Sequence, residues 1–203
     1  DLEGWKNMLQ HYFASCAIAD RAVGRILDGL EKSPYADNTL VILWSDHGYA
    51  LGEKLHMTKF ALWDDANQIN FFVKDPRNPQ SAGKRSYRPV SLIDIYPTVM
   101  SMAGLDLPDP RITGHDLTPL FVNPDANWEV PAQSTYGDVA NNMIRTEERK
   151  LIQYMDGGRE VYDMLKDPEE FDNLAGKSVV VKTEAELEKL LEIAIEEGSY
   201  SSN

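Results

Sequence analysis

The chain has 203 residues, which is enough for one domain or for one domain with a small appendage. Hydrophobic residues make up 42% of the sequence, enough for a packed core, and the formal net charge is −13. Nucleic-acid binding needs clustered lysine and arginine, so this charge argues against nucleic acid as a general partner. It leaves room for one local cationic pocket that binds a small anion.

The single cysteine, Cys16, excludes a disulfide within the chain and leaves the redox compartment open. No apolar run reaches the length of a transmembrane helix, so we expect no membrane span. No basic segment followed by an apolar one opens the chain as a secretion signal would. Residues 1–5 resemble the middle of a protein, and we expect the chain to be part of a longer one.

The first predicted helix carries apolar residues at spacings of three and four, which place them on one face. Ser33-Pro34 ends it, and we expect Cys16 to lie in the core on its apolar stripe. Residues 39–44 form a continuous apolar run, which is typical of a strand in a sheet covered on both faces. The residues of the helical stripe are Met8, Tyr12, Cys16, Ala19, Val23, Ile26 and Leu30.

A second core strand is predicted at residues 68–73, followed by a loop at 75–83. A second helix then begins with Asp94 as its N-cap and Pro97 in its first turn, and it ends at Gly104. These elements continue an α/β arrangement.

The pattern changes in the second half of the chain. Residues 106–127 are rich in proline, aspartate and glycine, and we expect them to wrap the surface. Two alternating runs, 150–155 and 159–164, flank Asp156-Gly157-Gly158 and predict a β-hairpin. Residues 135–138 and 142–146 are expected to add strands to it.

A last helix is predicted from Thr183, which with Glu186 forms a capping box, to Gly198. The predicted organisation is an α/β part at residues 1–127 and a small antiparallel α+β part at residues 128–203.

Asp46 and His47 directly follow the first predicted strand, and sites in open α/β sheets form outside the carboxyl ends of strands. A carboxylate oxygen and an imidazole nitrogen together suit Zn²⁺, Mn²⁺, or a Ca²⁺ or Mg²⁺ site with one unusual ligand. The alternative is a plain strand-to-loop turn in which Asp46 caps and Gly48 turns. The residues by themselves favour the two interpretations equally.

Lys59 lies next to the apolar segment 60–63, which would desolvate its ammonium group and strengthen its hold on an oxyanion. The alternative is a solvated surface charge. His56 would share a helical face with Lys59, either as a general acid, as a sulfate contact or as a structural histidine. A metal beside an anion pocket is the outline of an ester hydrolase.

Other polar residues have two interpretations each. In one interpretation, Asp64 and Asp65 are hydrogen-bond partners that position Lys59 or His56. In the other, they are helix caps or surface charges. His11 and His115 have no partners in sequence and are expected to be structural, with Gly114-His115-Asp116 as an alternative neighbour of the site.

Several segments together carry a resemblance to a known family, and each is modest alone. They are 12–20 with 23–27, 43–53, 54–63, 88–98 with 103–104, 113–120, and 160–164 with 167–169 and 173–174. In this order they resemble the C-terminal portion of a type I sulfatase of the alkaline phosphatase superfamily. The segment 43–53 is similar to the metal-binding segment of iduronate-2-sulfatase-like and choline-sulfatase-like members.

The resemblance implies the C-terminal part of an alkaline-phosphatase-like α/β/α sandwich with a small C-terminal antiparallel α+β subdomain. By position it makes Asp46 and His47 two ligands of a divalent cation, commonly Ca²⁺, with Mn²⁺, Mg²⁺ and Zn²⁺ as alternatives. Many relatives have asparagine where His47 stands. Lys59 would contact the sulfate group, with His56 as a second candidate contact.

The family's nucleophile is a formylglycine hydrate made from cysteine or serine in a C-x-P-S-R-type motif. Cys16 is followed by Ile18 and Asp20 at the proline and arginine positions, so we do not interpret it as that nucleophile. The resemblance therefore implies that the nucleophile belongs to an N-terminal part of the same enzyme. We expect no turnover by this chain alone.

Two other functions remain open at this point. One is a phosphodiesterase or phosphonate monoester hydrolase of the same superfamily, and the other is a non-catalytic C-terminal module. The resemblance further implies a sulfated small molecule or carbohydrate as substrate and a secreted or periplasmic location.

Overall fold

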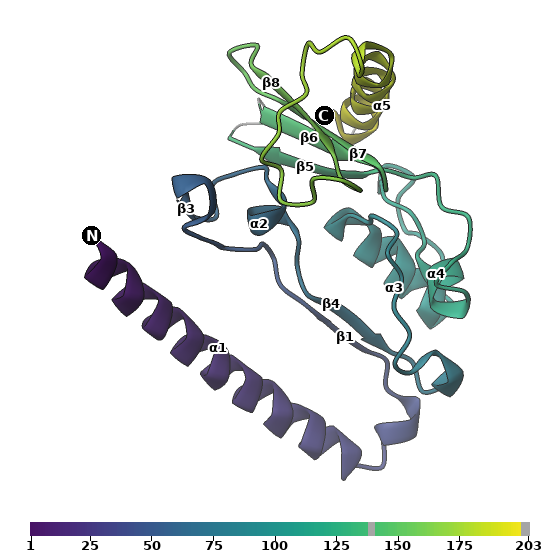
Figure 1. The fold of residues 1–203 in the computed structure, drawn as a ribbon. Coiled ribbons are helices and arrows are strands. Elements are labelled where there is room, and N and C mark those ends of the chain that lie inside the picture. Colours follow the sequence, from purple (N-terminus) through teal and green to yellow (C-terminus); the bar gives the residue numbers. More distant parts are fainter. Residues whose placement is uncertain (138–140, 200–203) are drawn as a thin grey trace. The chain divides into compact units, whose positions relative to one another are not determined.

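The computed structural model describes residues 1–137 and 141–199 (Figure 1). The chain forms two compact units, one of Asp1–Trp44 with Asn70–Ala82 and one of Ser45–Ile69 with Gly83–Asn203. The predicted boundary near Asn127 stays a prediction.

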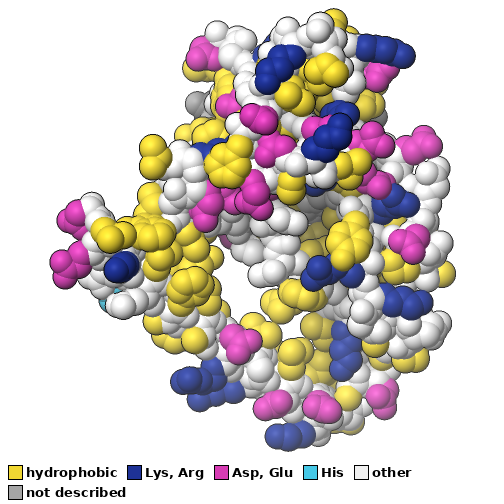
Figure 2. Space-filling model, viewed as in Figure 1, with side chains coloured by type: hydrophobic (Ala, Val, Ile, Leu, Met, Phe, Trp, Pro, Cys, Tyr) yellow, Lys and Arg dark blue, Asp and Glu magenta, His cyan; other side chains and the backbone are white. Residues whose placement is uncertain are grey.

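The first unit begins with the long helix α1, Leu2–Glu31, whose first turn is capped by the Asp1 carboxylate accepting from the Gly4 amide at 2.6 Å. The helix ends where the sequence predicts, just before Ser33-Pro34. No residue of α1 is buried, and Cys16 is exposed, so its predicted place in the core is wrong. Figure 2 shows hydrophobic side chains exposed along this helix. No described element buries its apolar face, so that face stays open to solvent.

The rest of the first unit is a short antiparallel ribbon. After the 3₁₀ turn η1, Ala36–Asn38, strand β1, Val41–Trp44, pairs with β4, Phe71–Lys74. The two predicted strands are confirmed, but the expected cover on both faces is absent among the described residues, since Trp44 and Phe72 are 47% and 58% exposed. The predicted loop after β4 contains the 3₁₀ turn η3, Pro79–Ser81.

The second unit is built on a four-stranded antiparallel sheet whose strands follow the chain order. The predicted hairpin is confirmed, because Gln153 pairs with Arg159 and the Tyr154 amide donates to the Gly158 carbonyl at 2.9 Å. Of the strand expected at residues 135–138, Asp138 lies outside the described residues. The strands are β5, Ala132–Tyr136, β6, Asn141–Arg145, β7, Arg149–Gln153, and β8, Arg159–Asp163.

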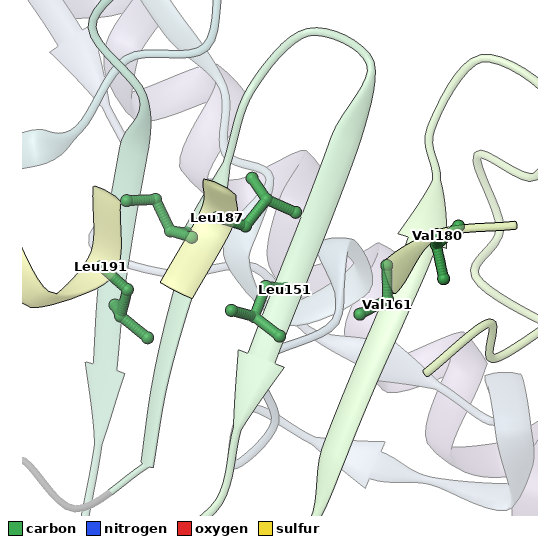
Figure 3. Close-up of a cluster of buried hydrophobic side chains, with 6 residues drawn as sticks. Leu151, Val161, Val180, Leu187 and Leu191 are labelled. Atoms are coloured by element: carbon green, nitrogen blue, oxygen red, sulfur yellow. The ribbon is translucent and has the colours of Figure 1, made fainter. Parts of the chain in front are cut away.

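Helix α5, Val181–Ser199, covers one face of this sheet, and Figure 3 shows its leucines pointing onto the strands. The helix begins two residues before Thr183, so the predicted capping box lies inside it and does not start it. The apolar cluster between α5 and the sheet is fully closed to solvent at its centre, with Leu151 and Val161 each 0% exposed. Its buried members are Ile144, Leu151, Val161, Val180, Leu187 and Leu191.

The opposite face of the sheet packs against the segment 45–69, which contains all four predicted site residues. Leu62, only 2% exposed, is buried there among side chains of the sheet, with Trp63 packed beside it. The remaining buried members are Met143, Ile152, Tyr162 and Met164. The sheet therefore separates α5 from the candidate site.

Three short helical elements of the second unit follow the site segment in sequence and precede the first strand of the sheet. They are η4, Leu92–Asp94, α3, Ile95–Ala103, and α4, Thr118–Val122. Asp94 precedes α3 as predicted, but its carboxylate accepts from the amides of Ser91 and His115, each at 2.8 Å, and not from α3. Gly104 ends α3 with a φ of 69°, as predicted.

The stretch 106–127 does more than wrap the surface as expected. It contains α4, whose Leu120 is 5% exposed, and Leu117 just before it is 1% exposed. Leu117 and Leu120 are three residues apart, so both fall on one face of a single helical turn and are buried there. The proline and glycine residues around them made this segment look like a surface loop in the sequence. Among the described residues, no helix is long and apolar enough to cross a membrane.

Candidate active site

The second unit brings His47 and Lys59 together by a short hairpin. Strand β2, Ala50–Leu51, pairs antiparallel with β3, Met57–Thr58, so the residues just outside the pair return to the same place. The Lys59 Nζ lies 3.0 Å from the His47 Nε2. The segment from His56 to Lys59 is extended through β3, so the predicted shared helical face is wrong.

Gly48 explains the glycine of the Asp-His-Gly motif. Its amide donates to the Ala66 carbonyl at 2.8 Å, and a Cβ at this position would lie only 2.4 Å from the Asp65 carbonyl oxygen. Any side chain would therefore push away α2, Asp64–Asn67. The motif needs glycine for this close backbone approach, which holds the backbone next to His47 against α2.

The His47 ring is held in one orientation by the backbone of Gly48. Its Nδ1 lies 2.7 Å from the Gly48 carbonyl oxygen, which can only accept, so Nδ1 is the protonated nitrogen. The Nε2 is left with a lone pair, and the Asp46 Oδ2 lies 3.6 Å from it. A histidine that is fixed by a carbonyl at one nitrogen and keeps a lone pair at the other is typical of metal ligands.

Asp46 and Lys59 face solvent. The Asp46 side chain is 82% exposed, and Lys59 is exposed as well. The expected desolvation of Lys59 is not found among the described residues, because the neighbouring Phe60 is itself 58% exposed. The ammonium group is available to an anion that approaches from solvent.

His56 faces the interior of the unit. Its ring packs edge-on against Trp63, with centroids 5.8 Å apart and an angle of 79° between the planes. Its Nε2 is buried and has no hydrogen-bond partner among the described residues. The structure thus brings Asp46, His47 and Lys59 together and directs His56 toward the sheet.

Lys54 is a residue that the sequence did not single out. Its Nζ is buried without a hydrogen-bond partner among the described residues, and it lies over the rings of Trp63 and Tyr162 at 4.5 and 4.7 Å. Burial lowers the Lys54 pKa, while the nearby carboxylates of Glu170 and Glu160 oppose that shift. No sequence pattern marks such a site, because the rings come from two distant segments.

The backbone around Lys54 is strained. Lys54, Leu55 and Thr58 have φ values of 51°, 61° and 82°, in the left-handed region that side chains other than glycine disfavour. Such strain persists only where surrounding contacts over-determine the conformation, and it clusters at functional sites.

Asp64 neither orients Lys59 nor stays on the surface as a simple cap. Its Oδ1 lies 2.7 Å from the Lys150 Nζ, and its Oδ2 lies 3.3 Å from the Arg145 Nε. Its amide donates to the Glu170 Oε2 at 2.6 Å. Asp64 therefore ties the site segment to the sheet.

The remaining sequence candidates have clear structural surroundings. Burial raises the Asp65 pKa, and the Glu53 carboxylate adds to the effect. The His115 ring packs edge-on against Trp128, and its Nδ1 lies 3.6 Å from the buried Asp94 carboxylate, which supports the structural role expected for it. Within the described ranges no group of three or more His, Cys, Asp or Glu side chains is placed to hold a metal ion.

The chain matches the family model described as Sulfatase over residues 1–105. It is 39% identical over 171 residues to a sulfatase of Formosa agariphila, covering 84% of this chain and 33% of that protein. It is 31% identical to an N-acetylglucosamine-6-O-sulfatase of Bacteroides thetaiotaomicron, covering 95% of this chain and 38% of that protein. The chain thus spans about a third of the length of these curated relatives.

Solved structures agree. A protein in complex with its substrate D-glucosamine-2-N,6-O-disulfate matches with a TM-score of 0.76 and 28% identity, over 95% of this chain and 40% of that one. A phosphonate monoester hydrolase of Agrobacterium radiobacter also matches with a TM-score of 0.76, at 27% identity over 89% of this chain and 40% of that one. The mixed helix and sheet architecture is the α/β fold of these proteins, and the chain belongs to the sulfatase family.

Proposed function

We propose that this chain forms one wall of the active site of a metal-dependent sulfuric ester hydrolase. The observation that carries the proposal is the 3.0 Å contact between the Lys59 Nζ and the His47 Nε2. It places a solvent-facing cation beside a carboxylate and imidazole pair, in a chain of the sulfatase family.

Asp46 and His47 fit the cation that the family resemblance implies. The unprotonated Nε2 and the exposed carboxylate lie 3.6 Å apart, which lets both contact one ion. A bound divalent cation, Ca²⁺ first among the candidates, would offset negative charge on the sulfuryl oxygens. The two side chains supply part of a coordination shell, and we assign the rest to the wider enzyme.

Lys59 would hold the sulfate group. Without an anion its ammonium group donates to His47, and an incoming sulfate oxygen offers a stronger, charge-assisted partner. The exchange would free the His47 Nε2 for the metal. Anion and metal binding would therefore support each other at this pair.

The group that attacks sulfur, a formylglycine by family resemblance, is assigned to a part of the enzyme outside these residues. Cys16 supports this assignment, because Ile18 and Asp20 replace the proline and arginine of the modification motif. His56 is retained as a second sulfate contact only if its ring can turn away from Trp63.

Sulfated carbohydrates are the substrate class that the relatives favour. One relative is an N-acetylglucosamine-6-O-sulfatase, and one structural neighbour was solved with a disulfated glucosamine. By the same family resemblance, we propose a secreted or periplasmic location for the whole enzyme, with its N-terminal part as the partner of this chain.

A second candidate reaction is phosphonate or phosphate ester hydrolysis. The structural neighbour that is a phosphonate monoester hydrolase is as similar in fold as the sulfated-sugar complex. Comparing the full enzyme on a sulfate monoester and a phosphonate monoester of the same alcohol separates the two reactions, and a preference for the phosphonate would overturn the first.

The test of the site uses the imidazole signals of His47 in an NMR titration of the chain. Ca²⁺ should shift them in the wild type and not in Asp46→Ala, while inorganic sulfate should shift them in the wild type and not in Lys59→Met. Asp172→Ala and Lys177→Met change exposed residues elsewhere and serve as matched controls.

Two results would contradict the proposal. Equal responses of the wild type and both site variants would remove Asp46 and Lys59 from the site. Hydrolysis of an aryl sulfate by this chain alone with Ca²⁺, above background, would show that the nucleophile lies within it.

A further inference from the structure

An exposed aromatic pair lies directly beside the candidate sulfate site. The rings of Phe60 and Tyr136 are 58% and 41% exposed, and their centroids are 5.9 Å apart with 40° between the planes. The Lys59 Nζ lies 5.9 Å from the centre of the Phe60 ring. The contacts thus run in order from the proposed metal ligands Asp46 and His47 to the Lys59 ammonium group and then to the two rings.

The exposure of this pair is not a sign of a loose segment. Leu62, two residues after Phe60, is 2% exposed in the core, and the Ala61 amide donates to the Lys59 carbonyl at 2.9 Å. Tyr136 is the last residue of β5, and its carbonyl accepts from the Asn141 side chain at 3.0 Å. The backbone beside each ring is therefore fixed by packing or by a hydrogen bond, while both side chains stay exposed.

We propose that Phe60 and Tyr136 form a subsite for the alcohol part of a sulfate monoester whose alcohol carries a ring. The inference rests on the proposed function and extends it from the sulfate group to the rest of the substrate. A sulfate ester that accepts from Lys59 carries its alcohol within a few ångströms of the anion. Ring pairs pack at roughly 4.5–7 Å between their centres. Because the Lys59 Nζ lies 5.9 Å from the centre of the Phe60 ring, a sulfate held by Lys59 leaves its alcohol within packing distance of that ring.

The pair selects by shape and apolar area more than by hydrogen bonding. Both a sugar ring and an arene present a face that can cover Phe60 and Tyr136, whereas a short open-chain alcohol cannot. The subsite therefore favours ring-bearing sulfate esters over open-chain ones. The single phenol hydroxyl of Tyr136 adds one polar contact, which a sugar can use and an arene cannot.

The experiment compares four probes with the chain by NMR: inorganic sulfate, methyl sulfate, phenyl sulfate and glucosamine 6-sulfate. Phenyl sulfate and the sugar sulfate should bind more tightly than methyl sulfate and should shift the ring signals of Phe60 and Tyr136. Phe60→Leu and Tyr136→Leu should each weaken the two ring-bearing probes by about 2- to 12-fold. Inorganic sulfate should bind these variants as it binds the wild type.

Conservative and distant variants complete the test. Tyr136→Phe should keep the affinity for phenyl sulfate, and Phe171→Leu, which changes another exposed ring of the second unit, should change nothing. Loss of sugar binding alone in Tyr136→Phe would identify a carbohydrate as the preferred ligand.

Failure of this inference differs from failure of the proposed function. A preference for ring-bearing probes that survives Phe60→Leu and Tyr136→Leu, or the absence of ring shifts with every probe, overturns the subsite. Binding of inorganic sulfate that is unaffected by Lys59→Met overturns the sulfate site itself.

Discussion

The two faces of the four-stranded sheet in the second unit are covered by different chemistry. On one face, α5 buries a cluster of aliphatic side chains that includes Leu151 and Val161. On the other face, a second apolar cluster around Leu62 and Ile152 lies beside ion pairs, aromatic rings and hydrogen bonds that join the site segment to Glu160, Lys150 and Tyr162. Strand alternation produces this difference, because neighbouring residues of β7 point to opposite faces.

The difference suggests a division of labour. Aliphatic packing is non-directional, and it stabilises the fold in proportion to the apolar area that it removes from water. Ion pairs and hydrogen bonds have fixed geometry, and they satisfy their partners in one arrangement only. The polar face is therefore suited to hold the site segment in place, and mutations on the two faces should have separable effects.

The largest effect is expected from Lys150→Met on the polar face. Lys150 is 0% exposed, and its Nζ lies 2.7 Å from both the Asp64 and the Glu170 carboxylates. Removing the cation leaves two like charges close together and partly or fully buried, so the free energy of unfolding should fall by about 3–5 kcal/mol. Urea denaturation measures the change, with Lys177→Met as a control at an exposed position.

The same variant has a defined pH dependence. Burial raises the Glu170 pKa, and Lys150 opposes that shift. When the pKa of a carboxyl group is higher in the folded state than in the unfolded state, the protein loses stability as the pH rises from the unfolded-state pKa to the folded-state pKa. Without Lys150 the Glu170 pKa should rise further, so the destabilisation should shrink as the pH falls from neutral toward about 4. A loss that is constant with pH would contradict this account.

A loss of about 2–5 kcal/mol is expected from Leu151→Ala on the aliphatic face, since it leaves a cavity where Leu151 was 0% exposed. It should leave the His47 imidazole shifts unchanged in the folded protein, whereas Lys150→Met, which removes the partner of Asp64 on the site segment, should change them. Ile26→Ala, at a position 71% exposed in α1, should change stability by less than about 0.5 kcal/mol. Equal perturbation of His47 by both sheet variants would remove the distinction between the faces.

Glu160→Gln should have an intermediate effect. Its carboxylate accepts from the Trp63 Nε1 at 2.7 Å and from the Tyr162 hydroxyl at 2.6 Å. The amide keeps an acceptor but loses the charge, so we expect a loss of about 1–3 kcal/mol and faster hydrogen exchange of the Trp63 indole. Glu192→Gln, at an exposed position of α5, is the matched control. An unchanged indole exchange rate would show that Glu160 does not anchor the site segment.

The sequence predicts much of the fold for clear reasons. The hairpin of β7 and β8 combines alternating strands with an Asp-Gly-Gly turn, and α1 has a stripe of apolar residues that a proline ends. Burial is harder to predict, because the same stripe predicts a core position for Cys16 whether or not anything covers it. Periodicity reports which face is apolar and not what packs on it.

The candidate site is predicted in part for a similar reason. Asp46 and His47 are adjacent in sequence and follow a strand, so their position alone makes them candidates. Lys54 and Asp64 find their partners Tyr162 and Lys150 in a distant part of the chain, and no local pattern encodes such pairs. The helical relation expected between His56 and Lys59 fails because the β2–β3 pairing extends that segment.

The smallest expected effect concerns the backbone strain at Leu55, in the site segment. Leu55 is 99% exposed and has a φ of 61°, so its side chain contributes no packing and pays for a left-handed conformation. Leu55→Gly should relieve roughly 1–2 kcal/mol of strain, partly offset by about 0.5–1 kcal/mol of glycine's extra unfolded-state entropy. We expect stability to stay level or rise slightly, whereas Met155→Gly, 78% exposed at an ordinary φ, should lower it. A clear loss in Leu55→Gly would mean that Leu55 makes a contact essential to the loop, and the strain would then be held by Leu55 and not by Lys54 and its aromatic partners.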